Sequence, residues 1–393
     1  MRNWPTLALG DLFEIARGGS PRPIDQFITD DPDGINWISI SDASESSKFI
    51  KQTKRRIKAS GASRSRSVKP GDFLLTNSMS FGRPYIMATT GCIHDGWLLL
   101  RPRREDIDRN YFYHLLGSDI IYSKFERLAA GATVKNLNID LVSGVEVSLP
   151  SLPEQRRIAA ILDEADVLQA KRRAALAQLD EMARAIFVEM FGDPATNPKN
   201  WPVVNIGDLV ASAAYGTSEK AGAEGKIPIL RMNNLTYGGA LDLINLKYID
   251  LPASQFERYT VQKGDILFNR TNSAELVGKT AVFDQDAPMA FAGYLVRLRT
   301  NAFATPEYVS AFLNSTHGKS TLRAMCKSII GMANINAKEV QRIPIPKPPR
   351  ALQGEFAERL NTLAGTRQKH RQSAREFESL FSSLQHRAFR GEL

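Results

Sequence analysis

The sequence repeats itself at an interval of about half its length, and this repeat limits the possible folds more than any other feature. The opening segment NWPTLALGDLFE returns as NWPVVNIGDLVA, which places Trp4 against Trp201, 201 − 4 = 197 residues later. SVKPGDFLL returns as TVQKGDILF, with Gly71 against Gly264, 264 − 71 = 193 residues later. Three more pairs keep the order: GWLLLRPR with GYLVRLRT, NLN with NIN, and VSLPSLP with IPIPKPP. Five ordered matches predict two copies of one unit of about 197 residues.

Composition and charge are those of a folded protein with a modest excess of basic residues. Hydrophobic residues make up 43% and charged residues 24% of the 393 residues, which excludes global disorder. The net charge of +9 is compatible with a polyanionic partner but does not prove one. Cys92 and Cys326 lie far apart without C-x-x-C spacing, which argues against structural zinc and a disulfide framework. No long apolar run or signal-peptide pattern occurs, so a cytoplasmic location is expected.

Each unit divides into a part with strand signals and a part with a helical signal. Residues 1–150 and 193–346 alternate short β-branched or aromatic runs with Gly, Pro, Asn and Asp, and then contain two helical stretches. This pattern predicts an α+β domain in each unit. Residues 151–192 and 347–393 follow a proline stop and are amphipathic, which is typical of long helices. Residues 193–200 are expected to form a short linker between the units.

The apolar positions of the two long helices alternate in steps of four and three residues, the spacing of a coiled coil. Both stripes become polar near the middle, at Gln169 and Arg172 in the first helix and at Arg367 and His370 in the second. If the helices pack antiparallel, only one register lets these polar residues meet each other; alternatively they extend into solvent. The predicted seam consists of Ile158, Leu162, Gln169, Arg172, Leu176, Leu179, Phe356, Leu360, Arg367, His370, Phe377 and Leu384.

The segment NSAELVGKT, residues 272–280, comes close to a phosphate-binding loop. That loop requires Gly, four residues and then Gly-Lys-Ser/Thr, whereas Ser273 stands in place of the first Gly. The matching segment of the first unit, SMSFGRPY, has no Gly-Lys-Thr, and KTAVF after Gly278 has a strand pattern where a P-loop requires a helix. Nucleotide binding is therefore not expected.

Polar and basic side chains in the matching loops are instead candidates for DNA contacts. Arg and Lys neutralise phosphates, and Asn, Arg, Ser and Thr bond base edges. The stretch KQTKRRIKASGASRSRS, residues 51–67, has seven Lys or Arg and no acid. For any single residue the alternative is a role in closing its own turn. The candidates are Ser20, Arg22, Ser41, Asp42, Arg64, Arg66, Asn77, Ser78, Arg83, Lys135, Asn136, Thr217, Ser218, Lys220, Arg231, Asn233, Asn269, Arg270, Thr271, Asn272, Ser273, Lys279 and Asn334.

Patterns for catalysis and metal binding are missing from the sequence. There is no Asn-Pro-Pro-aromatic motif of amino-methyltransferases and no G-x-G-x-x-G after a strand, and the five histidines have no metal-ligand spacing. We therefore expect a non-catalytic chain without a metal or bound cofactor of its own.

At the level of whole segments, the chain resembles the specificity subunits of type I restriction-modification systems. LPSLPEQRRIAAILDEAD, FVEMFGDPATNPKNWP, GDILFNRTNSAELVGKTAVF and the terminal RAFRGEL are similar to recurring segments of that family, and the resemblance covers nearly the whole chain. The second helix departs from it, because it opens as PPRALQGEF where the first has LPEQRRI.

The resemblance implies two target-recognition domains, residues 1–150 and 193–346, joined by two long antiparallel coiled-coil helices with a pseudo-two-fold relation. It implies a non-catalytic subunit that reads a bipartite target in double-stranded DNA. Two modification methyltransferase subunits and restriction motor-nuclease subunits would be its partners, and S-adenosylmethionine, ATP and Mg would be bound by them. The alternative is a stand-alone bipartite DNA-binding protein, such as a repressor, without enzymatic partners.

Overall fold

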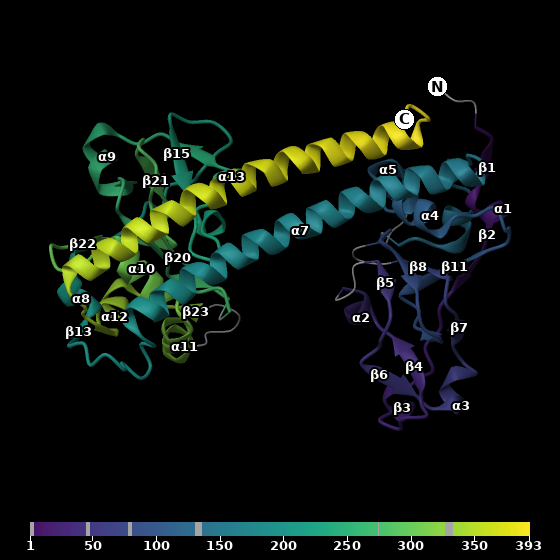
Figure 1. Ribbon diagram of the computed structural model, residues 1–393, viewed down its shortest axis with the longest axis horizontal. Coiled ribbons are helices and arrows are strands. Elements are labelled where there is room, and N and C mark those ends of the chain that lie inside the picture. Colours follow the sequence, from purple (N-terminus) through teal and green to yellow (C-terminus); the bar gives the residue numbers. More distant parts are fainter. Residues whose placement is uncertain (1–3, 45–47, 78–80, 130–135, 274, 327–332) are drawn as a thin grey trace. The chain divides into compact units, whose positions relative to one another are not determined.

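The chain folds into two compact units, each of which receives part of two long helices (Figure 1). The computed structural model describes residues 4–44, 48–77, 81–129, 136–273, 275–326 and 333–393. Unit 1 comprises the chain up to Arg172 together with Ser373–Leu393, and unit 2 comprises Arg173–Gln372. The long helices are α7 (Leu152–Phe191) and α13 (Arg350–Phe389), each of 40 residues.

Unit 1 is built on two five-stranded sheets and one strand pair. The first sheet has the order β2 (Phe13–Arg17), β11 (Trp97–Pro102), β8 (Phe73–Thr76), β9 (Pro84–Met87), β5 (Phe49–Ile50). The second has the order β3 (Ile28–Thr29), β6 (Arg55–Ile57), β4 (Ile35–Ile38), β10 (Gly91–Ile93), β7 (Arg66–Val68). The pair is formed by β1 (Thr6–Ala8) and β12 (Glu146–Ser148).

Helices cover the first sheet and close the core of unit 1. They are α1 (Leu9–Leu12), α4 (Arg109–Leu116), α5 (Asp119–Ala129) and α6 (Ile139–Ser143), while α2 (Ile40–Ser44) and α3 (Ala59–Ala62) are short turns elsewhere. Phe13 and Phe112 meet edge to face with ring centroids 5.1 Å apart, and both are fully buried. Ile158 and Leu162 of α7 and Phe389 of α13 join the same cluster, so the long helices are part of this core.

Unit 2 repeats this plan with different side chains. One sheet has the order β14 (Val210–Tyr215), β22 (Leu295–Thr300), β18 (Ile266–Asn269), β20 (Thr280–Val282), and the other β16 (Lys247–Ile249), β15 (Ile227–Leu230), β21 (Met289–Phe291), β17 (Thr260–Val261). Two strand pairs are β13 (Val203–Asn205) with β24 (Pro344–Pro346), and β19 (Thr271–Asn272) with β23 (Ala333–Asn334). The helices are α8 (Ile206–Leu209), α9 (Ala253–Tyr259), α10 (Pro306–Asn314), α11 (Thr316–Met325) and α12 (Ala337–Gln341).

The repeat predicted from the sequence is confirmed by equivalent interactions in the two units. Gly71 and Gly264 both have φ +92°, a conformation that favours glycine, in the turns before β8 and β18. The aspartate that follows each glycine is buried and pairs with an arginine of the neighbouring strand: Asp72 with Arg101 of β11 at 2.7 Å, and Asp265 with Arg299 of β22 at 2.8 Å. The GD dipeptide of each copy therefore fixes the same turn.

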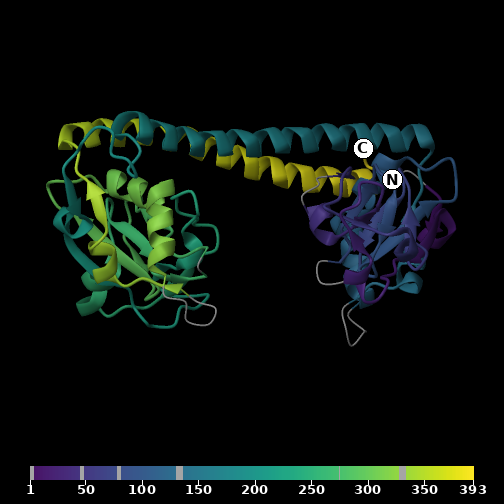
Figure 2. The same cartoon turned by 90° about the horizontal axis from the view of Figure 1, so that it is seen from below.

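In both units the two long helices run antiparallel and pack against the α+β domain (Figure 2). In unit 1, Arg172 donates a hydrogen bond to Ser373 and lies 5.6 Å from the ring centroid of Phe377. In unit 2, Arg367 pairs with Asp180 at 2.7 Å. The expectation that the polar seam residues meet each other is therefore wrong for Arg172 and Arg367. Two guanidinium groups repel each other, whereas a hydroxyl, an aromatic face and a carboxylate attract them.

Burial along the predicted seam is strongest where the helices contact a domain. Ile158, Leu162 and Phe356 are fully buried. The other seam residues are half-buried: Gln169, Arg172, Leu176, Leu179, Leu360, Arg367, His370, Phe377 and Leu384. None of the helices in the described part of the chain has the length and apolar character that a membrane crossing requires.

Candidate nucleic-acid interface

In each unit, loops that are far apart in the sequence meet at one edge of the sheet whose central strand follows the GD turn. The GD turn lies at the start of that strand, and the loops meet at its other end. In unit 1, β2 and β8 end at this edge and β11 and β9 begin there, because antiparallel pairing sets Arg17 opposite Leu98 and Trp97 opposite Thr76. Unit 2 has the same arrangement for β14, β18, β22 and β20. We call this part of each unit its loop edge: residues 17–22, 77 and 94–96 in unit 1, and residues 215–220, 270–273, 292–294 and 333–335 in unit 2.

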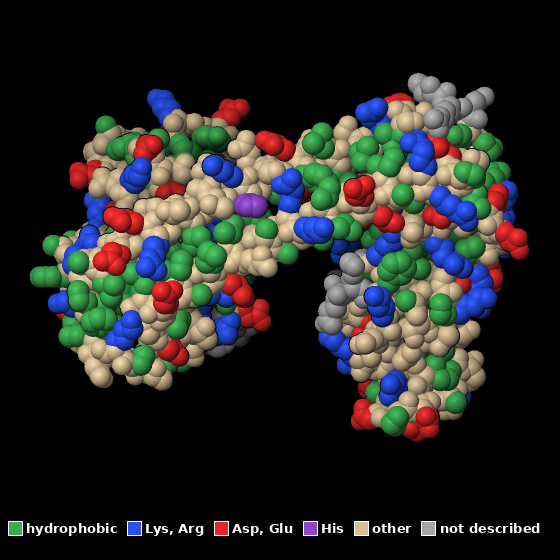
Figure 3. All heavy atoms as spheres, in the orientation of Figure 1, with side chains coloured by type: hydrophobic (Ala, Val, Ile, Leu, Met, Phe, Trp, Pro, Cys, Tyr) green, Lys and Arg blue, Asp and Glu red, His purple; other side chains and the backbone are tan. Residues whose placement is uncertain are grey.

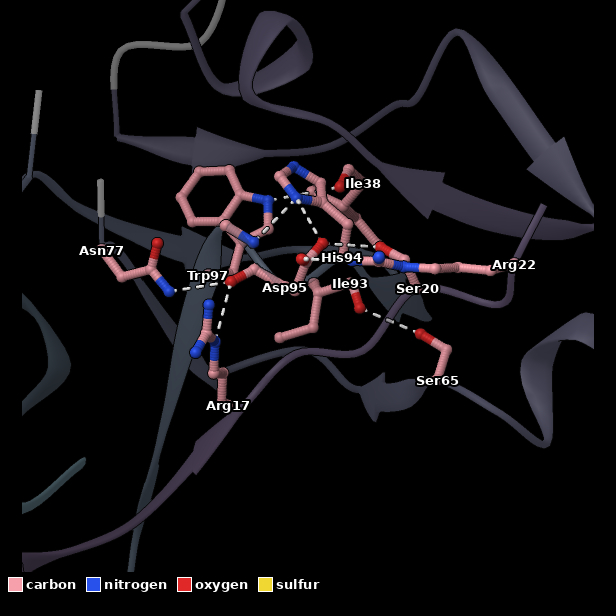
Figure 4. A network of polar contacts seen from close by, with 11 residues as sticks. Arg17, Ser20, Arg22, Ile38, Ser65, Asn77, Ile93, His94, Asp95 and Trp97 are labelled. Carbon is pink, nitrogen blue, oxygen red and sulfur yellow. Dashed lines mark hydrogen bonds and ion pairs between the residues drawn. The ribbon is translucent and has the colours of Figure 1, made fainter. Parts of the chain in front are cut away.

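The loop edge of unit 1 is organised around Asp95 (Figure 4). Its Oδ1 accepts a hydrogen bond from Ser20 Oγ at 2.7 Å, and its Oδ2 lies 3.6 Å from the guanidinium of Arg22. Its backbone carbonyl accepts bonds from Arg17 Nε at 3.1 Å and from Asn77 Nδ2 at 2.8 Å. Residues 17–22 and Asn77 thus hold one short turn from two sides of the chain. Sequence reasoning missed Asp95, because a single acid in a turn carries no periodic or motif signal.

Hydrogen bonding and burial shift the pKa values of two groups in this turn. The hydrogen bond from Ser20 is the main cause that lowers the pKa of Asp95, so its carboxylate is charged at neutral pH. Burial lowers the pKa of His94, so its imidazole is neutral at pH 7. His94 Nδ1 accepts a bond from the backbone N–H of Gly96 at 2.9 Å, which leaves the proton on Nε2.

Some predicted contact residues of unit 1 are exposed. Ser20 is half-buried and Arg22 exposed at the loop edge, and Arg83, just before β9, is exposed as well. Arg64 and Arg66 are exposed at the other sheet, where the guanidinium of Arg64 lies 5.6 Å from the ring centroid of Phe27. Ser41 is exposed in α2 and Asn136 is half-buried. Ser78 and Lys135 lie outside the described residues.

Two predicted residues of unit 1 are buried and have side chains that bond within the domain. Asn77 is buried and donates to the carbonyl of Asp95. Asp42 is also buried, and its carboxylate accepts bonds from the backbone N–H groups of Ser39 at 2.8 Å and Lys54 at 3.0 Å. Both side chains stabilise loops, so a DNA contact stays a prediction only for the exposed side chains.

The loop edge of unit 2 carries aromatic rings and an arginine, and its turn at residues 292–294 has no carboxylate. The guanidinium of Arg270 lies 5.0 Å from the ring centroid of Tyr215, whose hydroxyl accepts a bond from Ala337 N at 3.0 Å. Tyr294, which precedes β22, is 52% exposed, and Asn334 of β23 is exposed beside Thr271. Aromatic faces and a guanidinium suit stacking and hydrogen bonding to nucleic acid. Tyr215 and Tyr294 were not among the predicted residues.

Other predicted residues of unit 2 divide into exposed and buried groups. Ser218, Lys220 and Asn233 are exposed, whereas Arg231, Asn272 and Ser273 are half-buried. Thr217 and Thr271 are buried, and Thr217 Oγ1 accepts a bond from Glu219 N at 3.1 Å, which closes its own turn. Asn269 is fully buried, and its side-chain amide has no hydrogen-bond partner in the described part of the chain. The buried side chains do not face solvent in this conformation.

The Gly-Lys-Thr segment forms a hairpin turn that leads into a strand. Gly278 N donates to Asn269 O at 2.8 Å, and β20 begins directly afterwards at Thr280. Lys279 is buried and donates to Met232 O at 3.1 Å, while Lys319 donates to Gly278 O at 2.8 Å. The strand after the glycine agrees with the expectation that this segment is not a P-loop.

Two buried lysines at this hairpin have lowered pKa values. Burial lowers the pKa of Lys279. Burial, with smaller contributions from Lys279 and Arg323, lowers the pKa of Lys319 to about 8.

Elsewhere on the surface the visible faces of both units mix Lys and Arg with Asp and Glu (Figure 3). Among the described residues, no cluster of His, Cys, Asp and Glu has the make-up of a metal site.

Comparison with known sequences finds one family that matches both repeats of the chain. The family described as "Type I restriction modification DNA specificity domain" matches the chain twice, over residues 1–178 and 198–376. The type I restriction enzyme EcoKI specificity subunit of Escherichia coli (strain K12) is 26% identical over 316 residues, 75% of this chain and 68% of that protein. The StySPI specificity subunit of Salmonella potsdam is 27% identical over 314 residues, 75% of this chain and 67% of that protein.

Solved structures with a similar fold cover nearly the whole chain. One, described as the structural basis underlying complex assembly and conformational transition of the type I R-M system, covers 100% of this chain and 99% of that chain, with a TM-score of 0.57 and 18% identity. The type I restriction-modification system S subunit from M. genitalium covers 98% of this chain and 96% of that chain, with a TM-score of 0.51 and 16% identity. At these identities the likeness concerns the fold alone.

Proposed function

We propose that this chain, which belongs to the family of type I restriction modification DNA specificity domains, reads a bipartite sequence in double-stranded DNA with its two loop edges. The observation that carries the proposal is the contrast between these edges. Their strands and backbone bonds are equivalent, but Asp95 with Arg22 lies in one and Arg270 with Tyr215 and Tyr294 in the other. Equivalent frames with different side chains suit the reading of two different half-sites.

The accessible side chains at and beside each loop edge would contribute to recognition in two ways, by phosphate contacts and by base contacts. Arg22 and Lys220, together with Arg83 just before β9, would neutralise phosphates, a contribution to affinity that weakens as salt concentration rises. Arg270 would donate to base edges from its place beside Tyr215, and Asn334 offers an amide to an adenine or a phosphate. Specificity would come from the few side chains that reach the groove, and affinity from the basic side chains around them.

The two long helices would form an antiparallel coiled-coil spacer between the target-recognition domains. Support comes from the contacts within each unit, where α7 and α13 pack against each other and join the domain core. Each helix is about 60 Å long at 1.5 Å per residue, which exceeds one turn of duplex, roughly 34 Å. The length of the pair would then set the number of unread base pairs between the half-sites.

The chain itself would be non-catalytic and would assemble with enzymes. Two modification methyltransferase subunits would bind the two repeated units, and restriction subunits would join through them. S-adenosylmethionine, ATP and Mg would be bound by those partners, and the methyl group would be transferred to adenine. Support for this part comes from family membership and from the repeat, because two equivalent units offer the same partner two equivalent binding places.

Co-expression with its neighbouring genes tests the proposal. The tagged chain should retain a methyltransferase through purification, and sequencing of modified adenines in the host genome should show one split sequence with a spacer of constant length. The chain alone should show no methyl transfer. If no partner is retained and no adenine is modified, while the chain alone still protects a split sequence from nuclease digestion, it acts as a stand-alone DNA-binding protein.

A further inference from the structure

A charged carboxylate at the loop edge of unit 1 requires an explanation, because the proposed ligand is a polyanion. The side chain of Asp95 is 45% exposed, and the hydrogen bond from Ser20 orients it without covering it. A carboxylate in that position repels phosphates and lowers affinity for DNA of any sequence. It raises selectivity only if it meets a hydrogen-bond donor on a base.

The turn that contains Asp95 does not need the carboxylate for its own structure. Its backbone is closed by Trp97 N donating to His94 O at 3.2 Å and by the bond from Gly96 N to His94 Nδ1. Unit 2 makes the equivalent turn, where Leu295 N donates to Ala292 O at 2.8 Å.

The offset between these turns shows which residue replaces Asp95. Trp97 and Leu295 begin the equivalent strands β11 and β22, 295 − 97 = 198 residues apart, which places Asp95 opposite Gly293. The same turn therefore forms without any side chain at this position. The closing of this turn therefore does not account for the acid in unit 1.

We propose that the Asp95 carboxylate is a specificity-determining group of unit 1, and that it accepts a hydrogen bond from the exocyclic amino group of a cytosine in the major groove. The inference rests on the proposed function. Among bases, cytosine offers this amino donor without an acceptor beside it on its own edge. Adenine offers its amino group beside the acceptor N7, and guanine and thymine present acceptors alone, whose partial negative charge repels a carboxylate.

Arg22 supplies the complementary half of the contact. Its guanidinium is 82% exposed and lies 3.6 Å from Asp95 Oδ2, so donor and acceptor groups of the protein stand side by side. A G·C pair presents the same alternation in its major groove, with the amino group of cytosine next to O6 and N7 of guanine. The pair Asp95 and Arg22 therefore fits one G·C base pair, with Ser20 holding the carboxylate in place.

Selection from a pool of random duplexes tests the inference, with the full chain in its co-purified complex at one fixed salt concentration. Asp95→Asn should reduce the preference for C·G at one position of one half-site by roughly 5- to 150-fold and leave the other half-site unchanged. Asp106→Asn is the matched control. Asp106 is also 45% exposed and paired with an arginine, Arg104 at 2.7 Å, but it lies beside the start of α7. This control should leave every position unchanged.

A second variant keeps the test decisive if Asp95→Asn lowers stability. Ser20→Ala keeps the carboxylate and removes the bond that orients it, so it should weaken the preference at the same position by a smaller factor. Unchanged preference in both variants, or tighter binding to all sequences without a change in preference, would overturn the inference. If the unmodified complex selects no split sequence at all, the proposed function itself fails.

Discussion

Gln155 and Gln353 make the same three hydrogen bonds, each at the start of a long helix. Both are fully buried, and they lie 353 − 155 = 198 residues apart, the interval of the repeat. The partners are Asp108 N (2.8 Å), Asp106 O (2.9 Å) and Pro150 O (2.9 Å) for Gln155, and Thr305 N (2.9 Å), Phe303 O (3.2 Å) and Pro348 O (2.9 Å) for Gln353. The glutamine thus fastens each long helix to its own domain, although the surrounding segments LPEQRRI and PPRALQGEF differ.

Replacing either glutamine by leucine should lower the free energy of unfolding by about 3 kcal/mol, because three backbone groups, which are buried or partly buried, lose their partner. Urea unfolding of Gln155→Leu and Gln353→Leu measures the change. Gln368→Leu, on an exposed position of α13, is the control and should change stability by less than about 0.5 kcal/mol. Equal effects of the buried and exposed substitutions would show that these bonds do not fasten the helices.

Lys319 should make stability depend on pH in the alkaline range. Its folded pKa is lowered from 10.5 to about 8, chiefly by burial, so between these values the unfolded chain binds more protons. The contribution of Lys319 to the free energy of unfolding therefore rises with pH across that window. Lys319→Met removes the contribution, so its stability relative to wild type should fall by about 2 to 3 kcal/mol from pH 7 to pH 10. A difference that stays constant over this range in urea titrations contradicts the assignment.

Lys279 should have no part in nucleotide hydrolysis, because its ammonium group is buried and bonded to Met232 O within a hairpin. The purified chain should show no ATP hydrolysis above the buffer background, and Lys279→Ala should leave that background unchanged. An ATPase activity in the chain that this substitution abolished would restore the P-loop interpretation, provided that the variant remains folded by circular dichroism.

Periodic and repeated features were predictable from the sequence, whereas the contacts of single loop residues were not. Repeat spacing and hydrophobic patterns indicated two α+β domains and two long helices, because these depend on many residues acting together. Asp95, Tyr215 and Tyr294 gave no such signal. They reach the loop edge only because distant strands pair there, as when Trp97 lies opposite Thr76.

Side-chain direction limited the prediction of the site as well. Asn77 and Thr217 have the residue types of DNA contacts, but one bonds a backbone carbonyl and the other a backbone N–H nearby. Sequence spacing also could not choose partners on the helices. Arg367 reaches Asp180, an acid outside the predicted seam, because opposite charge outweighs the heptad position.

Exchanging residues 1–150 for the equivalent domain of another family member should change one half of the recognised sequence and leave the other half and the spacer unchanged. The reason is that all loop-edge residues of unit 1 lie in this segment, while those of unit 2 lie in residues 215–335. Mapping of modified adenines in cells that carry the chimera measures both halves at once. A change in both halves would contradict independent reading by the two units.

Lengthening the helix pair should lengthen the unread spacer. Four residues inserted after Ala175 extend α7 by about 6 Å and rotate its far end by about 40°. One base pair advances the duplex by about 3.4 Å, so the spacer should grow by one or two base pairs with both half-sites unchanged.

The insertion in α7 alone should also lower stability, because α13 cannot keep its contacts in both units at once. Arg172 with Ser373 belongs to unit 1 and Arg367 with Asp180 to unit 2, so a longer α7 must break one set. A matched insertion of four residues after Gln372 lengthens α13 between the same two sets and should restore stability while keeping the longer spacer. Sequencing of modified sites from the double-insertion complex decides the matter: an unchanged spacer in an active complex would mean that the helices do not set the distance between half-sites.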